Sequence, residues 1–141
     1  MEGKVGMMRY VATFVAGLVV GSAMMPASAQ RSGGPPPGSS VAELRLYTID
    51  RGKLDDFANQ WRAGVYPLRT KLGYQIPFAA KIPATNQFVW LLTYDGPESW
   101  DKKEDAYYAS PERTQIKPDP AQLIARPERW FVTPVITPVS K

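Results

Sequence analysis

The segment Gln87–Tyr94 predicts a β-strand that is apolar on both of its faces. Alternate side chains of a strand point to opposite sides of the sheet. One side carries Phe88, Trp90, Leu92 and Tyr94, and the other carries Val89, Leu91 and Thr93. An antiparallel sheet with helices on one side leaves its other side to water, where polar residues are expected. The sequence therefore predicts that a further layer, most simply a partner subunit, covers the open side of this sheet.

The other strands follow from shorter alternating patterns. They are predicted at 41–49, 74–82 and 128–135. Pro77 lies inside the strand at 74–82, and because proline cannot donate a ladder hydrogen bond, that strand should lie at an edge of the sheet or contain a bulge.

Two helices are predicted between these strands. Apolar residues at helical spacing indicate an amphipathic helix over 53–72, and Pro67 should kink or divide it near Gly64. The second helix is predicted to start at 95–98, with Pro97 at its first position. The resulting order β-α-β-β-α-β predicts an α+β, ferredoxin-like fold with a four-stranded antiparallel sheet.

The N-terminal part of the chain is typical of an export signal. Residues 1–29 combine a basic start, an apolar stretch and the small-residue site Ala27-Ser28-Ala29 before Gln30. A membrane anchor is the alternative, but the apolar stretch is shorter than the roughly 20 residues that span a bilayer. We therefore expect cleavage, no stable membrane insertion afterwards, and a periplasmic or secreted protein. The Pro/Gly/Ser-rich residues 30–40 predict a disordered linker, followed by one domain over 41–141.

Composition excludes many kinds of chemistry. The chain has no histidine and no cysteine, which removes thiol nucleophiles, histidine bases, histidine-ligated haem and zinc sites made of Cys and His. We accordingly predict no cofactor. The net charge is +4 and the basic residues are dispersed among acids, whereas nucleic-acid binding calls for a clustered basic surface. No nucleic-acid partner is predicted.

Several segments together resemble one known family. These segments are ELRLYT at 43–48, GKLDDF at 52–57, PLRTKLG at 67–73, FVWLLTY at 88–94 and AYYASPE at 106–112. In combination they are similar to the NIPSNAP proteins, which belong to the dimeric α+β barrel group. The resemblance covers about 41–137 and implies a homodimer in which two four-stranded sheets face each other. The chain departs from the family pattern at Arg51, where proline is frequent, and at Arg113, where an aromatic residue is frequent.

The first candidate site lies on the strand at 41–49. Glu43, Arg45 and Tyr47 share the face opposite Leu44 and Leu46. If the leucines meet the helices, the three polar residues point into the barrel between the sheets. There Arg45 would bind an anionic ligand together with Tyr47, since a buried charge requires a partner. Alternatively, Glu43 and Arg45 pair across the dimer or face water at the barrel mouth.

The second candidate site follows the predicted second helix. It consists of Tyr107, Tyr108, Ser110, Glu112 and Arg113. Phenol groups, the free amides of a helix start and a guanidinium suit the recognition of a carboxylate or phosphate. In the alternative interpretation one tyrosine packs on the sheet, Ser110 caps a helix and Glu112 complements the helix dipole.

Three carboxylates on the same helix could suggest a metal site. Asp101, Glu104 and Asp105 have the spacing of one helix face. With Lys102 and Lys103 beside them, a solvated charged face explains them better, and no metal is predicted.

These observations predict a homodimeric barrel that binds a small anionic or aromatic molecule or an envelope partner. One alternative is a dimer with a purely structural role. The other alternative is a cofactor-independent oxygenase- or isomerase-like enzyme, whose acid–base work would fall to Tyr107, Glu112 or Glu43. The sequence leaves the catalytic residues unassigned, and the absence of histidine favours binding over catalysis.

Overall fold

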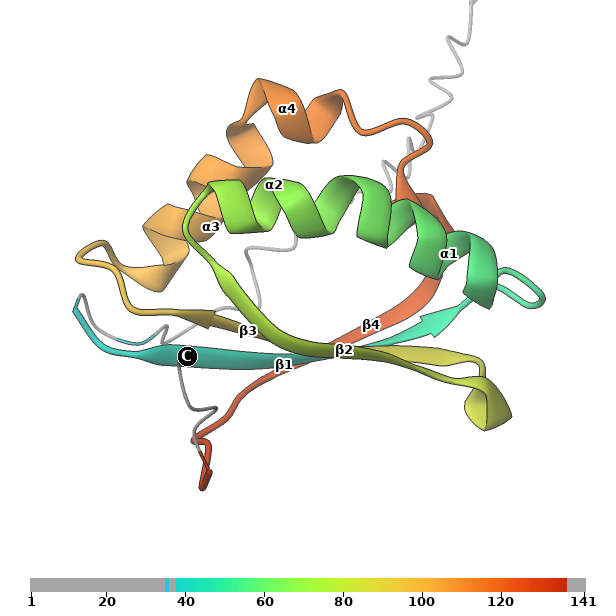
Figure 1. Ribbon diagram of the computed structural model, residues 1–141, viewed down its shortest axis with the longest axis horizontal. Helices are drawn as coiled ribbons and strands as arrows, with labels where there is room; N and C mark the ends of the chain where they lie inside the picture. Colours follow the sequence, from blue (N-terminus) through green and yellow to red (C-terminus); the bar gives the residue numbers. More distant parts are fainter. Residues whose placement is uncertain (1–34, 36–37, 137–141) are drawn as a thin grey trace, which may run out of the picture. The chain divides into compact units, whose positions relative to one another are not determined.

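The computed structural model of the chain describes residues 35 and 38–136. Its elements are β1 (Val41–Ile49), α1 (Leu54–Gln60), the π-helical η2 (Trp61–Val65), α2 (Tyr66–Lys71), β2 (Gln75–Ile82), the 3-10 turn η3 (Pro83–Thr85), β3 (Gln87–Tyr94), α3 (Trp100–Ala109), α4 (Pro111–Thr114), the 3-10 turn η4 (Pro120–Leu123) and β4 (Ile124–Phe131). The four strands form one antiparallel sheet in the order β2-β3-β1-β4 (Figure 1). The predicted α+β, ferredoxin-like fold is confirmed.

The N-terminal predictions fall mostly outside the part of the chain that the structure describes. The signal peptide at 1–29 lies wholly outside it, and only residues 35 and 38–40 of the proposed linker lie inside. Among the described residues, no helix has both the length and the apolar character needed to cross a membrane.

The first helix runs through α1, η2 and α2, and its middle part is π-helical. The backbone N–H of Tyr66 donates to the carbonyl oxygen of Trp61, which is the five-residue step of a π-helix. Pro67 follows directly, and its ring would clash with the carbonyl four residues earlier in a regular α-helix. The predicted irregularity near Gly64 is therefore confirmed as a widened turn rather than a break.

Pro77 places β2 as expected. The strand lies at the edge of the sheet, and its register with β3 shifts between Gln75 and Phe78. Gly73, which ends the preceding helix, has a φ of 87°, a left-handed conformation that glycine adopts without a steric penalty.

Two predicted boundaries are wrong. The second helix begins at Trp100 rather than at Pro97, with Ser99 as its N-cap. The chain must first pass around the Tyr94 ring, which lies so close to Gly96 that a Cβ there would overlap it. The last strand covers Ile124–Phe131 rather than 128–135, because β4 pairs along the length of β1 and that pairing sets its ends.

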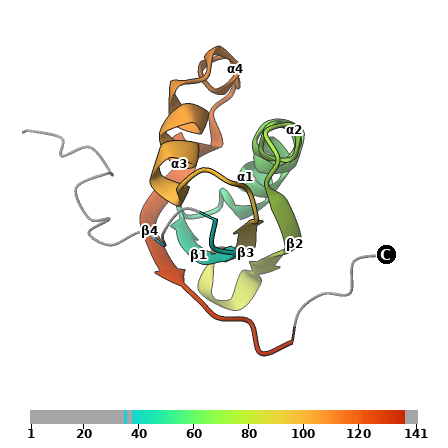
Figure 2. The ribbon, with the colours of Figure 1, turned by 90° about the vertical axis from the view of Figure 1, so that its left-hand side faces the viewer.

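The helices α1, α2, α3 and α4 lie on one face of the sheet (Figures 1 and 2). The β3 residues that meet them are buried and aromatic-rich, and Trp90 stands at the centre. The Trp61 ring of η2 lies 5.2 Å from the Trp90 ring and 5.0 Å from the Phe88 ring. These edge-on and tilted contacts are those that aromatic rings prefer, so the core forms between the first helix and β3.

The other face of the sheet carries no helix among the described residues, and it is apolar. The strand register aligns Trp130 of β4, Leu44 of β1, Leu91 of β3 and Phe78 of β2 in one row across the sheet. The two residues at the ends of this row, Trp130 and Phe78, are 47% and 45% exposed. The sequence expectation of a strand with two apolar faces is thus confirmed, and we call this row the open-face row.

Candidate functional site

The structure places the first predicted site on the opposite face from the one expected. Glu43, Arg45 and Tyr47 are buried beneath the helices, whereas Leu44 and Leu46 lie on the open face. Tyr47 packs edge-on against Phe57 of α1 at 6.1 Å. The expectation that the three polar residues face a barrel between sheets is therefore wrong, because the helices supply the charged and aromatic partners that these side chains need.

Arg45 belongs to a buried ion network around Glu104 of α3. Its Nη2 donates to Glu104 Oε2 at 2.7 Å, and its Nε donates to Glu43 Oε1 at 2.8 Å. The guanidinium of Arg69 in α2 also pairs with the Glu104 carboxylate. Tyr74 Oη donates to Glu104 Oε1 at 2.8 Å. The network thus ties both helices to β1. The interpretation of Glu104 as part of a solvated charged face is wrong, because the two arginines and Tyr74 bind its carboxylate beneath the helices.

The charges in this network remain fixed near neutral pH. Burial alone would raise the pKa of Glu104, but Arg45 and Arg69 outweigh burial and hold it well below the usual range. Burial likewise disfavours the two guanidiniums, yet the Glu104 carboxylate keeps the pKa of both above its ordinary value. Because none of these groups exchanges a proton near pH 7, the network supports the structure and is unsuited to acid–base catalysis.

The two predicted tyrosines have different surroundings. Tyr107 is buried, and the Arg69 guanidinium carbon lies 3.3 Å from its ring centre. Burial raises the pKa of Tyr107. Tyr108 is 41% exposed, and Arg129 Nη2 donates to its Oη at 3.3 Å. Burial of the Tyr108 phenol opposes its ionisation, but Arg45, Arg129 and Arg69 together lower its pKa.

The remaining predicted residues have local partners. Ser110 caps α4 by accepting from the Arg113 backbone N–H at 3.2 Å. The Arg113 guanidinium donates to both oxygens of Asp119 at 3.0 Å, so its charge is already neutralised. Glu112 is exposed and accepts from Lys71 Nζ at 3.3 Å, and its own backbone N–H and Lys71 lower its pKa. Of the alternatives weighed from the sequence, the capping role of Ser110 is confirmed.

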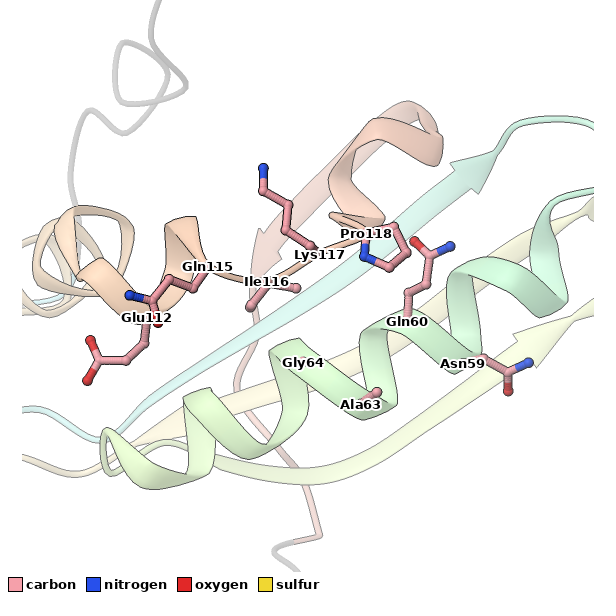
Figure 3. A pocket seen from close by; sticks show the side chains of 9 residues that line it. All are labelled: Asn59, Gln60, Ala63, Gly64, Glu112, Gln115, Ile116, Lys117 and Pro118. Carbon is pink, nitrogen blue, oxygen red and sulfur yellow. The ribbon is translucent and has the colours of Figure 1, made fainter.

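A cleft of about 520 Å³ opens between η2 and the segment that follows α4 (Figure 3). Glu112 is the predicted site residue that lines it. The apolar part of the lining has short side chains because Gly64 lies against Ile116. A Cβ on Gly64 would be 2.6 Å from a methyl carbon of Ile116. The rest of the lining comes from Asn59, Gln60, Ala63, Gln115, Lys117 and Pro118. We call this the η2–α4 cleft.

Two polar groups that line the η2–α4 cleft have no protein partner among the described residues. Gln60 Oε1 is buried and has no hydrogen-bond partner among the described atoms. Lys117 is exposed and forms no ion pair within residues 38–136. A buried acceptor without a donor costs about 1–3 kcal/mol, so this site suits a molecule that brings an N–H or O–H group to Gln60 and a negative charge to Lys117.

Sequence reasoning missed the structural roles of three charged residues that complete these sites. Arg69 falls in register with the apolar face of the first helix, four residues after Val65. Glu104 lies four residues after Trp100 and three before Tyr107, so helical spacing placed it on the buried face. For Arg129 the alternation of the strand separates two faces but does not tell which of them the helices cover.

The protein has a four-stranded antiparallel sheet with its helices on one face, and a buried ion network lies between the sheet and the helices. These features define an α+β protein with a ferredoxin-like fold and an open sheet. The sequence model of the NIPSNAP family matches residues 42–139, and this chain therefore belongs to the NIPSNAP family. Among curated protein sequences, none matches this chain.

Solved structures of similar proteins agree on the fold. A NIPSNAP domain protein of Burkholderia xenovorans is 19% identical, with 70% of this chain and 98% of that chain aligned and a TM-score of 0.60. A NIPSNAP family protein of Agrobacterium tumefaciens is 14% identical, with 72% and 100% aligned and a TM-score of 0.62. A candidate antibiotic biosynthesis monooxygenase of Bacteroides thetaiotaomicron is 16% identical, with 73% and 96% aligned and a TM-score of 0.55. At these identities the likeness concerns the fold alone.

Proposed function

We propose that this NIPSNAP protein is a homodimeric binding protein whose η2–α4 cleft holds a small organic anion. The observation that carries the proposal is a pair of groups in one cleft, the buried acceptor Gln60 Oε1 and the cation Lys117, neither of which has a side-chain partner among the described residues. A volume of about 520 Å³ lies within the range of small-molecule sites. Ile116 and Pro118 supply the apolar contact that such sites use beside their polar groups.

The homodimer is supported by the open-face row. A contiguous apolar strip across four strands is a surface that soluble proteins cover. A second copy covers it by two-fold symmetry with the same strip, which satisfies both faces of β3 at once. We further propose that the protein is exported to the periplasm or secreted, for which the support is the signal-like sequence at 1–29.

Small hydroxy acids test the η2–α4 cleft. The probe is 2-hydroxy-4-methylpentanoate, whose carboxylate can meet Lys117 and whose hydroxyl can donate to Gln60. We expect binding in ligand-observed NMR, weaker binding of the corresponding neutral amide, about tenfold weaker binding after Lys117→Gln, and none after Ala63→Leu, which fills the cleft. The matched control Ala106→Leu, on an exposed part of α3, should bind like the wild type. Unchanged binding in both cleft variants would rule this site out.

A second candidate function rests on Tyr108. A phenol whose pKa is lowered by three guanidiniums is ionised to a greater extent near neutral pH than an ordinary tyrosine, so more of it is present as a base. Tyr108 would then replace Tyr107, Glu112 and Glu43 as the acid–base group of an oxygenase- or isomerase-like enzyme. We expect ultraviolet titration to find one tyrosine ionising below pH 10, and Tyr108→Phe to remove that transition while Tyr66→Phe retains it. A titration with no early transition would exclude the catalytic role.

A further inference from the structure

A second hollow lies on the other side of the first helix, where η2 overhangs the edge strand β2. Its volume is about 440 Å³. It is lined by Trp61, Arg62 and Tyr66 from the helix, by Ala79 and Ala80 from β2, and by Phe88 from β3. We call this hollow the edge slot. No residue that lines it lines the η2–α4 cleft, so the two sites are separate.

One wall of the edge slot is aromatic and the opposite wall is small. The Trp61 and Tyr66 rings lie 5.8 Å apart with an angle of 40° between their planes, and Tyr66 is 43% exposed. Opposite them, Ala79 pairs with Trp90 and so points to the helical side, where its short side chain leaves room that a larger one would fill. A space between flat rings and a methyl group suits a planar aromatic ring, because such a ring can contact the aromatic wall face to face or edge to face.

The slot also has unpaired hydrogen-bond donors. Trp61 is only 5% exposed, and its indole Nε1 is buried without a partner among the described atoms. Buried donors of this kind are rare in proteins. Arg62 forms no ion pair or hydrogen bond within residues 38–136, and at the lip Lys81 is balanced by Asp55, with Nζ 2.6 Å from Oδ1. The net charge at the slot is therefore positive.

We propose that the edge slot binds a planar aromatic carboxylate, with the ring between the aromatic wall and Ala79 and the carboxylate on the Arg62 guanidinium and the Trp61 indole N–H. Guanidinium groups bind carboxylates through paired hydrogen bonds. The aromatic wall explains selection for a flat ring, and the free donors explain selection for an anion. This binding goes beyond the proposed function, because it uses a different cavity and a different class of molecule.

Titration of the full chain with 2-naphthoate tests the proposal by calorimetry. We expect binding that weakens about tenfold after Arg62→Gln and disappears after Ala79→Leu, whose added side chain occupies the slot. Trp61→Phe, which keeps an aromatic ring and removes the N–H donor, should also weaken binding. The matched control Arg51→Gln removes an exposed positive charge from the turn after β1 and should leave binding unchanged. 2-Naphthamide and cyclohexanecarboxylate should each bind at least tenfold more weakly.

The outcomes separate this site from the proposed one. Absence of 2-naphthoate binding, or binding that Arg62→Gln and Ala79→Leu leave intact, would overturn the edge slot. Loss of binding after Ala63→Leu instead would place the aromatic anion in the η2–α4 cleft, which would overturn this inference and support the proposed function. Circular dichroism of each variant at the titration temperature distinguishes lost binding from lost folding.

Discussion

Replacing Glu104 by alanine is expected to lower the free energy of unfolding by about 3–5 kcal/mol, the range measured when one partner of a buried ion pair is removed. The variant leaves the guanidiniums of Arg45 and Arg69 buried without the carboxylate that both of them contact. It also takes the acceptor of the Tyr74 hydroxyl away. Urea denaturation followed by tryptophan fluorescence measures this change.

The Glu104 carboxylate also makes the free energy of unfolding depend on pH. In the folded protein the pKa of Glu104 lies below its ordinary value of 4.5, so its contribution is present at neutral pH and is lost as the pH falls below about 4.5. The Glu104→Ala variant should therefore lose less stability than the wild type between pH 5 and pH 2. The control Asp105→Ala removes an exposed carboxylate from the same helix and should change stability by no more than about 0.5 kcal/mol. If Glu104→Ala and Asp105→Ala lower the free energy of unfolding by the same amount, the stabilising role of the network is contradicted.

The second large effect concerns the open face. Replacing Leu91, which lies in a central strand and in the open-face row, by lysine should weaken the dimer at least a hundredfold. In a two-fold interface the change brings two ammonium groups into an apolar contact, and burying them costs several kcal/mol. In the monomer the lysine side chain can reach water, so folding should be retained.

Sedimentation velocity over a range of concentrations measures this shift. Ala106→Lys, which adds the same charge to an exposed part of α3 on the helical side, should remain dimeric. If Leu91→Lys sediments like the wild type, the interface lies elsewhere on the molecule.

The fold could be predicted where local patterns decide the structure. The bounds of β1 and β3 follow from period-two alternation between turns, and both match the predicted ranges. Pro67 indicated the irregular helix and Pro77 the edge strand, because proline acts through its own ring and missing N–H. The ends of β4 could not be predicted in this way, since pairing with β1 determines them.

The candidate sites were harder to predict because their partners come from distant parts of the chain. Hydropathy places Leu44 and Leu46 against the helices and Arg45 between the two sheets of a barrel, yet Arg45 lies beneath the helices and pairs with Glu104, 59 residues away in sequence. Alternation identifies two faces of a strand but not which face the helices cover. Likewise, the η2–α4 cleft depends on Gly64 meeting Ile116, a contact between segments that no local pattern links.

Native mass spectrometry of the protein recovered from the cells that produce it tests whether the protein is a dimer that retains a small molecule. The masses give the first residue of the mature chain, the number of subunits and any bound small molecule in one experiment. We expect a dimer of chains that begin at Gln30, with bound mass that Ala63→Leu or Ala79→Leu removes. A stable monomer at micromolar concentration would contradict the homodimer and leave the apolar face of the sheet without its proposed cover.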